Sequence, residues 1–152
     1  MKKAAILIII SIVLLSFLAC EEAVKEITTT ISGTITDEGT PVVGAYVFAM
    51  QGLTIDGLLS LDIDLNSGTK VLSESGSYVI PALSPDTFQV IVIEDVNENN
   101  IIDYGTDRIG IYGDYTVIGD NTIPTSLTDV IIEEEGQDIE DIDIDRLFDF
   151  GF

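Results

Sequence analysis

The sequence has no histidine, no tryptophan and only one cysteine, and its six basic residues face 27 acidic ones among 152. The absence of histidine excludes imidazole base catalysis and His-ligated zinc or haem. A single cysteine excludes an internal disulfide and every Cys-x-x-Cys site. The formal charge of −21 argues against nucleic acid as a partner, because phosphate binding needs clustered Lys and Arg. At this length we expect one domain, alone or with a processed segment.

The beginning of the chain has the pattern of a secretory signal. Two lysines follow Met1, and a predominantly apolar run covers residues 4–15. A permanent spanning helix would need about 20 apolar residues, whereas this stretch ends at Cys20 and is followed by two glutamates. We therefore predict a signal peptide over residues 1–19.

The single cysteine, Cys20, stands at the end of this signal, directly after the small residue Ala19. This placement resembles the lipobox of bacterial lipoproteins, although Phe17 and Leu18 depart from the residues that the family prefers. The resemblance implies that Cys20 is acylated with palmitate-type chains and becomes the mature N-terminus. Glu21, in place of an aspartate, implies the outer membrane as the site of anchoring. An ordinary signal peptide with an incidental cysteine is the alternative.

Removal of the signal would leave four basic and 27 acidic residues, a formal charge of −23. Such a charge keeps a surface protein soluble and repels anionic lipid headgroups. We expect residues 20–26 to form the lipidated cysteine and a polar tether, and residues 27–152 to form the folded domain. The acidic residues are spread among apolar ones, which is not typical of a disordered acidic tail.

Apolar and β-branched residues predict short strands along this domain. Residues 27–36 alternate strictly, which is typical of a half-buried strand. Residues 42–50 are apolar at consecutive positions, which indicates a strand covered on both faces, and residues 88–93 form the most apolar strand. Further strands are expected at residues 70–73, 77–80, 115–118, 130–133 and 139–147. Because Gly, Pro, Asn and Asp turns separate these segments, the pattern predicts an all-β Greek-key β-sandwich of about seven strands.

Two segments carry more specific expectations. Residues 51–66 fit either a short helix or two strand fragments, and we predict a strand over Leu59–Leu65. In the last strand, Ile142 and Ile144 are expected to face inward. The alternate positions are expected to face water and to protect a sheet edge from aggregation; these are Asp141, Asp143 and Asp145.

Four short motifs occur in an order that is typical of one family. They are Ile31-Ser32-Gly33-Thr34-Ile35-Thr36, Gly39-Thr40-Pro41-Val42-Val43-Gly44-Ala45-Tyr46-Val47-Phe48-Ala49, Ser75-Gly76-Ser77-Tyr78-Val79-Ile80 and Asp86-Thr87-Phe88-Gln89-Val90. Together they resemble carboxypeptidase regulatory-like domains, which are transthyretin-like (prealbumin-like) seven-stranded Greek-key sandwiches. The resemblance implies a non-catalytic folding or binding module. The apolar insert at 51–66 and the acidic C-terminal third depart from the family pattern.

Residues 95–107 are the one segment with coordination chemistry. Oxygen-bearing side chains occur at positions 1, 3, 5 and 9 of an EF-hand-like loop, where alternate residues of a curled chain can point at one Ca²⁺ ion. The candidate ligands are Asp95, Asn97, Asn99, the backbone carbonyl of Ile101, Asp103 and Asp107. Thr106 stands where the pattern has a bidentate Glu, so we expect at best a weak site, with a Kd of about 10⁻⁴–10⁻³ M.

Two simpler interpretations accompany this calcium hypothesis. Residues 95–107 could form a polar turn that is rich in Asn and Asp because these residues favour turns. The repeat of the spacing at Asp62–Asn66 is better explained as an exposed strand face. Arg108 is expected to pair with Asp103 or Asp107 in a structural role.

We expect no enzymatic activity, because histidine is absent and no Gly-x-Ser-x-Gly or Ser-x-x-Lys motif occurs. The leading hypothesis is a lipid-anchored β-sandwich of the cell envelope that acts as a structural or protein-interaction module, with calcium as its cofactor. The alternative is an accessory module that binds a peptide or a glycan for an envelope complex. A glycan platform would use clustered aromatics, and Tyr104 lies within the loop while Tyr112 and Tyr115 follow it closely in sequence.

Overall fold

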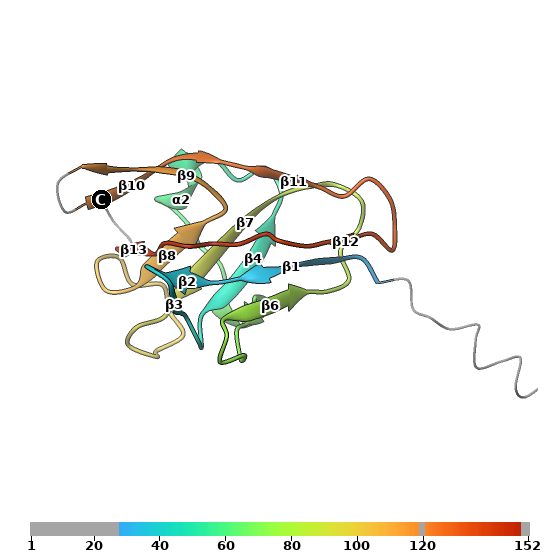
Figure 1. The fold of residues 1–152 in the computed structure, drawn as a ribbon. Helices are drawn as coiled ribbons and strands as arrows, with labels where there is room; N and C mark the ends of the chain where they lie inside the picture. The colour runs from blue at the N-terminus through green and yellow to red at the C-terminus, as the bar shows by residue number, and fades with distance from the viewer. Residues whose placement is uncertain (1–27, 119–120, 150–152) are drawn as a thin grey trace, which may run out of the picture.

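A computed structural model of the chain describes residues 28–118 and 121–149. The predicted signal peptide, Cys20 and the tether lie outside these ranges. Within them, no helix combines the length and the apolar character needed to cross a membrane. The described residues form β-sheets with very little helix (Figure 1).

The smaller sheet holds the N-terminal strand in its centre. Its order is β12-β1-β6, and the strands are β12 (Asp138–Ile139), β1 (Thr30–Thr34) and β6 (Ser77–Ile80). β6 is antiparallel to β1, with Tyr78 directly opposite Gly33. β12 is parallel to β1, so the two ends of the chain run side by side in the same direction.

The larger sheet is built around the longest strand, β7 (Thr87–Glu94). Its order is β13-β8-β7-β4-β5, and β11 pairs with the first half of β7. The bounds are β13 (Phe148–Asp149), β8 (Arg108–Ile111), β4 (Tyr46–Met50), β5 (Thr69–Lys70) and β11 (Asp129–Ile131). Two hairpins complete the fold, β2 (Thr36–Asp37) with β3 (Thr40–Pro41) and β9 (Gly113–Ile118) with β10 (Asn121–Leu127).

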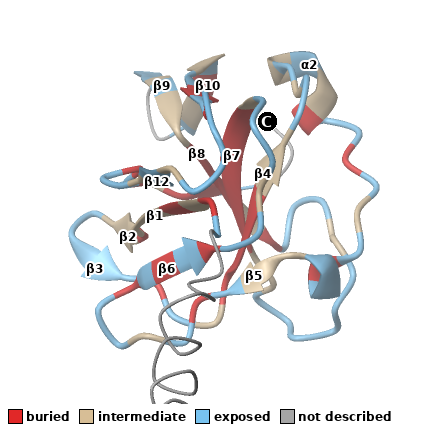
Figure 2. Ribbon diagram, turned by 90° about the vertical axis from the view of Figure 1, so that its right-hand side faces the viewer, coloured by how far each residue is buried: buried red, intermediate tan, exposed pale blue. Residues whose placement is uncertain are grey.

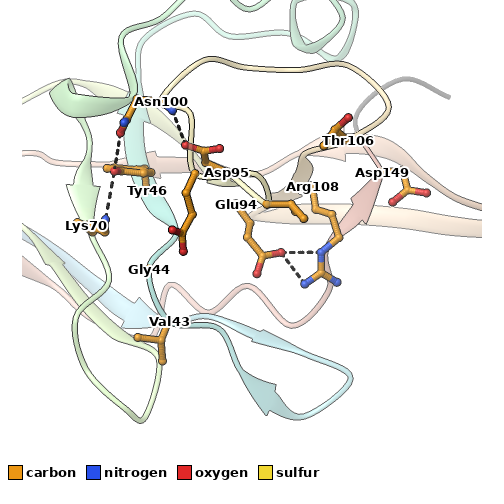
Figure 3. Close-up of a pocket in the computed structure, with 12 residues that line it drawn as sticks. Val43, Gly44, Tyr46, Lys70, Glu94, Asp95, Asn100, Thr106, Arg108 and Asp149 are labelled. Atoms are coloured by element: carbon orange, nitrogen blue, oxygen red, sulfur yellow. Dashed lines mark hydrogen bonds and ion pairs between the residues drawn. The ribbon is translucent and has the colours of Figure 1, made fainter.

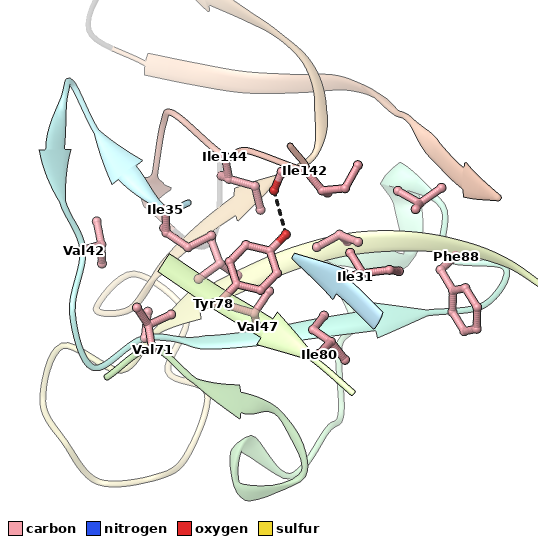
Figure 4. Packing of buried hydrophobic residues seen from close by; sticks show 14 of the residues in the cluster. Ile31, Ile35, Val42, Val47, Val71, Tyr78, Ile80, Phe88, Ile142 and Ile144 are labelled. Carbon is pink, nitrogen blue, oxygen red and sulfur yellow. Dashed lines mark hydrogen bonds between the residues drawn. The ribbon is translucent and has the colours of Figure 1, made fainter. Parts of the chain in front are cut away.

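The main core lies between the two sheets (Figure 4). β1 contributes Ile31, β7 contributes Val90 and Val92, and the C-terminal segment contributes Ile142 and Ile144. Alternate residues of each strand point to this core, as the period of two requires. The predicted all-β sandwich is therefore confirmed, with Ile142 and Ile144 buried and the intervening aspartates exposed.

A second apolar cluster covers the other face of the larger sheet. Ile91 and Ile93 of β7 point to this side, and Leu58, Leu61 and Leu65 pack against them. The leucines belong to the 51–66 insert, which forms the short helix α2 (Ile55–Leu58) and the 3-10 helix η1 (Leu65–Ser67). Figure 2 shows β7 buried along its length between the two layers.

The predicted strand over Leu59–Leu65 is wrong. Positions 61 and 65 fit the strand period of two, but they also lie three and seven residues after Leu58, which is helical spacing. The same apolar pattern was therefore compatible with a strand and with a helix. The exposed strand face predicted at Asp62–Asn66 is also wrong. Leu65 is fully buried. The side chain of Asp64 accepts a hydrogen bond from the backbone N–H of Asn66, at the start of η1.

The described residues contain thirteen strands, not about seven, and five of them have only two residues. Irregular backbone divides the longer strands that the sequence predicts. Ile31 pairs with Ile139, whereas Ile35 pairs with Ile144. The C-terminal residues therefore hold one extra residue between these two pairings. Asp141 adopts φ of 62° within this bulge.

The hydroxyl of a tyrosine joins β6 to the bulge across β1. Tyr78 of β6 reaches across β1, and its buried hydroxyl donates to the carbonyl oxygen of Ile142 at 2.6 Å (Figure 4). Gly33 lies between them, and a Cβ atom there would stand 2.1 Å from the same carbonyl oxygen. Only glycine allows this close approach.

Candidate functional site

The loop 95–107 connects β7 to β8 at one end of the sandwich. Figure 1 shows this loop and the β2–β3 hairpin at the end opposite to the point where the chain enters β1. The loop begins where the apolar pattern of β7 stops after Glu94. Its turn is made by Glu98, Asn100 and Gly105, all at positive φ. Asn100 therefore takes the conformation expected at the sixth position of the loop.

The first half of the loop folds back on its own oxygen atoms. The two carboxylate oxygens of Asp95 accept from the backbone N–H groups of Asn99 at 3.2 Å and Asn100 at 2.7 Å. The Oδ1 of Asn97 also accepts from the N–H of Asn99, at 3.2 Å. The Oδ1 of Asn99 accepts from the N–H of Ile101 at 2.7 Å.

Asp103 joins this arrangement from the second half of the loop. Its Oδ2 accepts from the side-chain amides of Asn97 at 2.9 Å and Asn99 at 2.6 Å. These two hydrogen bonds, first that of Asn97 and then that of Asn99, lower the pKa of the Asp103 carboxyl below its ordinary value. The fold thus brings together four of the predicted ligands, Asp95, Asn97, Asn99 and Asp103.

Asp107 has a different position, completely buried beneath the loop. Its carboxylate accepts from the backbone N–H of Asp103 at 2.7 Å and of Val96 at 3.1 Å, so it joins the two ends of the loop. Ile101 lies on the outside of the loop with 62% of its surface exposed. Asp107 thus braces the loop through two backbone amides, and its ligand role stays a prediction.

The chemistry of this group of residues suits a hard cation only in part. Carboxylate and amide oxygens are the ligands that Ca²⁺ prefers. Within the two described ranges, however, no three Asp, Glu or Cys side chains come together as a metal-binding group. Asn97 and Asn99 direct amide nitrogens at Asp103, so ion binding would require both to present Oδ1 to the centre.

Arg108 does not pair with Asp103 or Asp107, and that prediction is wrong. Its Nε donates to Glu94 at 2.6 Å, and its Nη1 pairs with Asp37 at 2.6 Å. Glu94 is the cross-strand neighbour of Arg108 in the β7–β8 register, which directs the side chain along the sheet and away from the loop. Partial burial lowers the pKa of Arg108, but the bonds to Glu94 and then to Asp37 outweigh it and raise that pKa overall.

A polar hollow of about 690 Å³ adjoins the loop (Figure 3). It is lined by residues from four separated parts of the chain: Val43, Gly44, Tyr46, Lys70, Glu94, Asp95, Val96, Glu98, Asn100, Thr106, Arg108 and Asp149. No local motif could have indicated this group, because only the pairing of β4, β5, β8 and β13 around β7 brings its members together.

Along one wall of the hollow, a chain of hydrogen bonds connects the ammonium group of Lys70 to the loop. Lys70 Nζ donates to the hydroxyl of Tyr46 at 3.2 Å, and that hydroxyl donates to Asn100 Oδ1 at 3.2 Å (Figure 3). The ammonium also lies 5.0 Å from the centre of the Tyr46 ring, within the range of a cation–π contact. The hollow is lined by Tyr46 and not by Tyr104, Tyr112 or Tyr115, the three tyrosines in or just after the loop.

The charges that line the hollow are mostly negative. Glu94 is neutralised by Arg108, and Asp95 is bound by backbone N–H groups. The carboxylates of Glu98 and Asp149 make no hydrogen bond or ion pair with another described residue, and Lys70 pairs with no described carboxylate. Lys70, Glu98 and Asp149 therefore face the hollow as charges that no described group of opposite sign neutralises.

Comparison with protein-family models, curated proteins and solved structures finds no match. The function must be argued from the residues and their geometry alone.

Proposed function

We propose that the chain is a lipid-anchored β-sandwich of the bacterial cell envelope, a structural or protein-interaction module that calcium stiffens. The observation that carries this proposal is the arrangement of the two ends of the sandwich. The chain enters β1 at one end, whereas the loop 95–107 lies at the other (Figure 1); the hollow is lined by this loop and lies beside it.

This arrangement suits a protein that is anchored at its N-terminus. Seven residues separate Cys20 from Thr28, and they span at most about 25 Å when extended. An acylated Cys20 would keep the sandwich close to the membrane, with the loop and the hollow on the side that faces away. The formal charge of −23 would hold the folded domain off anionic headgroups.

The loop supplies the stiffening part of the proposal. Asp95, Asn97, Asn99 and Asp103 already converge through hydrogen bonds, and rotation of the two Asn amides would place oxygen atoms around an ion. Ca²⁺ would replace hydrogen bonds that cross the loop by stronger ionic contacts. We assign no catalytic role: the sequence has no histidine, and its only thiol is the proposed acylation site.

The hollow favours a second candidate function, an accessory module that binds part of a partner molecule. Its volume is within the usual range for ligand sites, about 300–1,000 Å³. The unpaired Glu98 and Asp149 and the single aromatic wall suit a peptide with a cationic side chain better than a glycan, which would stack on several rings. The resemblance to carboxypeptidase regulatory-like domains agrees with either non-catalytic role.

Acylation is tested by growing expressing cells with an alkyne analogue of palmitate and then separating the membrane and soluble fractions. We expect the native chain to be labelled and membrane-bound, and the Cys20→Ser variant to be unlabelled and soluble. An unlabelled native chain, or a Cys20→Ser variant that stays in the membrane fraction, would contradict the proposed anchor.

A further inference from the structure

The first strand of the domain is bound along both of its edges. β6 pairs with one edge of β1 from Ile31 to Thr34. The other edge is covered by residues 137–147, named here the C-terminal segment. The backbone bonds that join them are Thr30 N to Gln137 O at 3.1 Å, Ile142 N to Ser32 O at 3.0 Å, Ile144 N to Thr34 O at 2.9 Å and Thr36 N to Ile144 O at 2.8 Å.

Side chains reinforce the same contact at each end. The Oγ1 of Thr30 donates to Asp138 Oδ1 at 2.7 Å, at the start of the strand. At its end, both the backbone N–H and the hydroxyl of Thr34 donate to Asp143 Oδ1 at 2.7 Å. Between these two points, Tyr78 passes over Gly33 and binds the carbonyl of Ile142. The three segments are thus tied by side chains from one end of β1 to the other.

The direction of these strands decides how they respond to a pull. β1 and the C-terminal segment are parallel, so the point where the chain enters β1 and the strand β13 beyond the end of the segment lie at opposite ends of the sandwich (Figure 1). A load between these two points slides the segments past each other along their length. All of the hydrogen bonds between them then carry the load together, whereas a load at one end would break them one after another.

We propose that β1, β6 and the C-terminal segment form a shear clamp, which carries tension between the N-terminal tether and a partner held at the far end of the sandwich. Asp149, which directly follows the clamped segment through Phe148, lines the hollow. A partner bound in the hollow would therefore pull along the axis of β1. The source of the load rests on the proposed anchor, but the mechanical property does not.

The test is single-molecule force spectroscopy on the whole chain in detergent, with Cys20→Ser to remove the native thiol. DNA handles are attached through exposed cysteines in two pairs. Thr28→Cys with Asp149→Cys loads the clamp in shear, and Thr28→Cys with Glu135→Cys pulls the two segments apart from the same end. We expect a several-fold higher unfolding force in shear, because forced unfolding follows the barrier along the loaded direction. Equal forces for the two pairs would overturn the proposal.

The Asp143→Ala variant tests whether side-chain hydrogen bonds contribute to the mechanical strength of the clamp, and Asp145→Ala is the matched control. Both aspartates are exposed on the same segment, but Asp145 bonds to Tyr115 and not to β1. We expect Asp143→Ala to lower the shear force and Asp145→Ala to leave it unchanged. An unaltered shear force in Asp143→Ala would remove that residue from the clamp. Because no measurement here depends on acylation, failure of the clamp and failure of the anchor give different results.

Discussion

At the scale of single residues, the most consequential contact is made by the hydroxyl of Tyr78. It is buried between the sheets and satisfies the carbonyl of Ile142, which comes inward because Gly33 has no side chain. A buried carbonyl without a partner costs roughly 1–3 kcal/mol. The tyrosine was visible in the sequence as part of a strand, but its partner lies 64 positions away, so no local pattern could have indicated the bond.

Tyr78→Phe is expected to lower the free energy of unfolding by about 1–3 kcal/mol, because the ring still fills its space while the Ile142 carbonyl loses its donor. Urea unfolding of the two proteins measures this difference. Tyr115→Phe is the control, since its hydroxyl makes an exposed 3.3 Å bond to Asp145; its effect should stay within about 0.5 kcal/mol. Equal effects of the two substitutions would show that the buried bond is not important.

Alkaline pH provides a second measurement on the same residue. Burial, then the charge of Asp143 and the neighbouring Tyr112, raise the pKa of Tyr78 above its ordinary value. The folded state therefore keeps a proton that the unfolded state releases above about pH 10. The unfolded state binds fewer protons there, so stability should fall as the pH rises beyond about 10. Tyr78→Phe should lack this part of the decline, and an identical pH profile in both proteins would contradict the assignment.

Asp107 is the second residue with an effect that is measurable at this scale. Asp107→Ala should destabilise the protein by about 1–3 kcal/mol for each amide left without a partner, those of Val96 and Asp103. Glu98→Gln changes a carboxylate in the same loop that has no described partner, and it should have almost no effect on unfolding. If thermal unfolding of Asp107→Ala matched that of the native protein, the carboxylate would not brace the loop.

At the scale of secondary-structure elements, the sequence predicted the positions of the strands better than it predicted which segments pack on the faces of the sheets. The apolar run in β7 indicated a buried strand, and the structure places its alternate residues in two different apolar clusters. The cover on the second face is the 51–66 insert, whose helices are too short to show a clear period. The ion pair of Arg108 with Asp37 was missed for a related reason, since Asp37 comes from a distant hairpin.

Two neighbouring leucines test whether this insert is an integral layer of the fold. Leu58 is 1% exposed beneath the insert, and Leu59 is 48% exposed on its outside. Leu58→Ala should cost about 2–5 kcal/mol because it opens a cavity against β7, while Leu59→Ala should change stability by no more than about 0.5 kcal/mol. Chemical denaturation distinguishes them. A small effect at both positions would mean that the insert is not packed on the sheet.

At the scale of the whole molecule, the two ends of the sandwich have different roles in the proposed function. The chain enters at one end, and the loop lies at the other (Figure 1), with the hollow beside the loop. The sequence predicted the converging side chains of the loop because their spacing is local. It could not predict the hollow, which combines residues as distant as Val43 and Asp149. It also could not show that the carboxylate of Asp107 accepts hydrogen bonds from two backbone N–H groups.

The most direct test of the proposed function is thermal unfolding in EDTA and in about 5 mM Ca²⁺, roughly ten times the expected Kd. At that excess, a ligand that binds only the folded state should add about 1.4 kcal/mol and raise Tm by several degrees. We predict that shift for the native chain and for Glu98→Gln, but not for Asp95→Ala and not with Mg²⁺. No shift with Ca²⁺, or the same shift in Asp95→Ala, would contradict the calcium-stiffened module and leave residues 95–107 as a hydrogen-bonded turn.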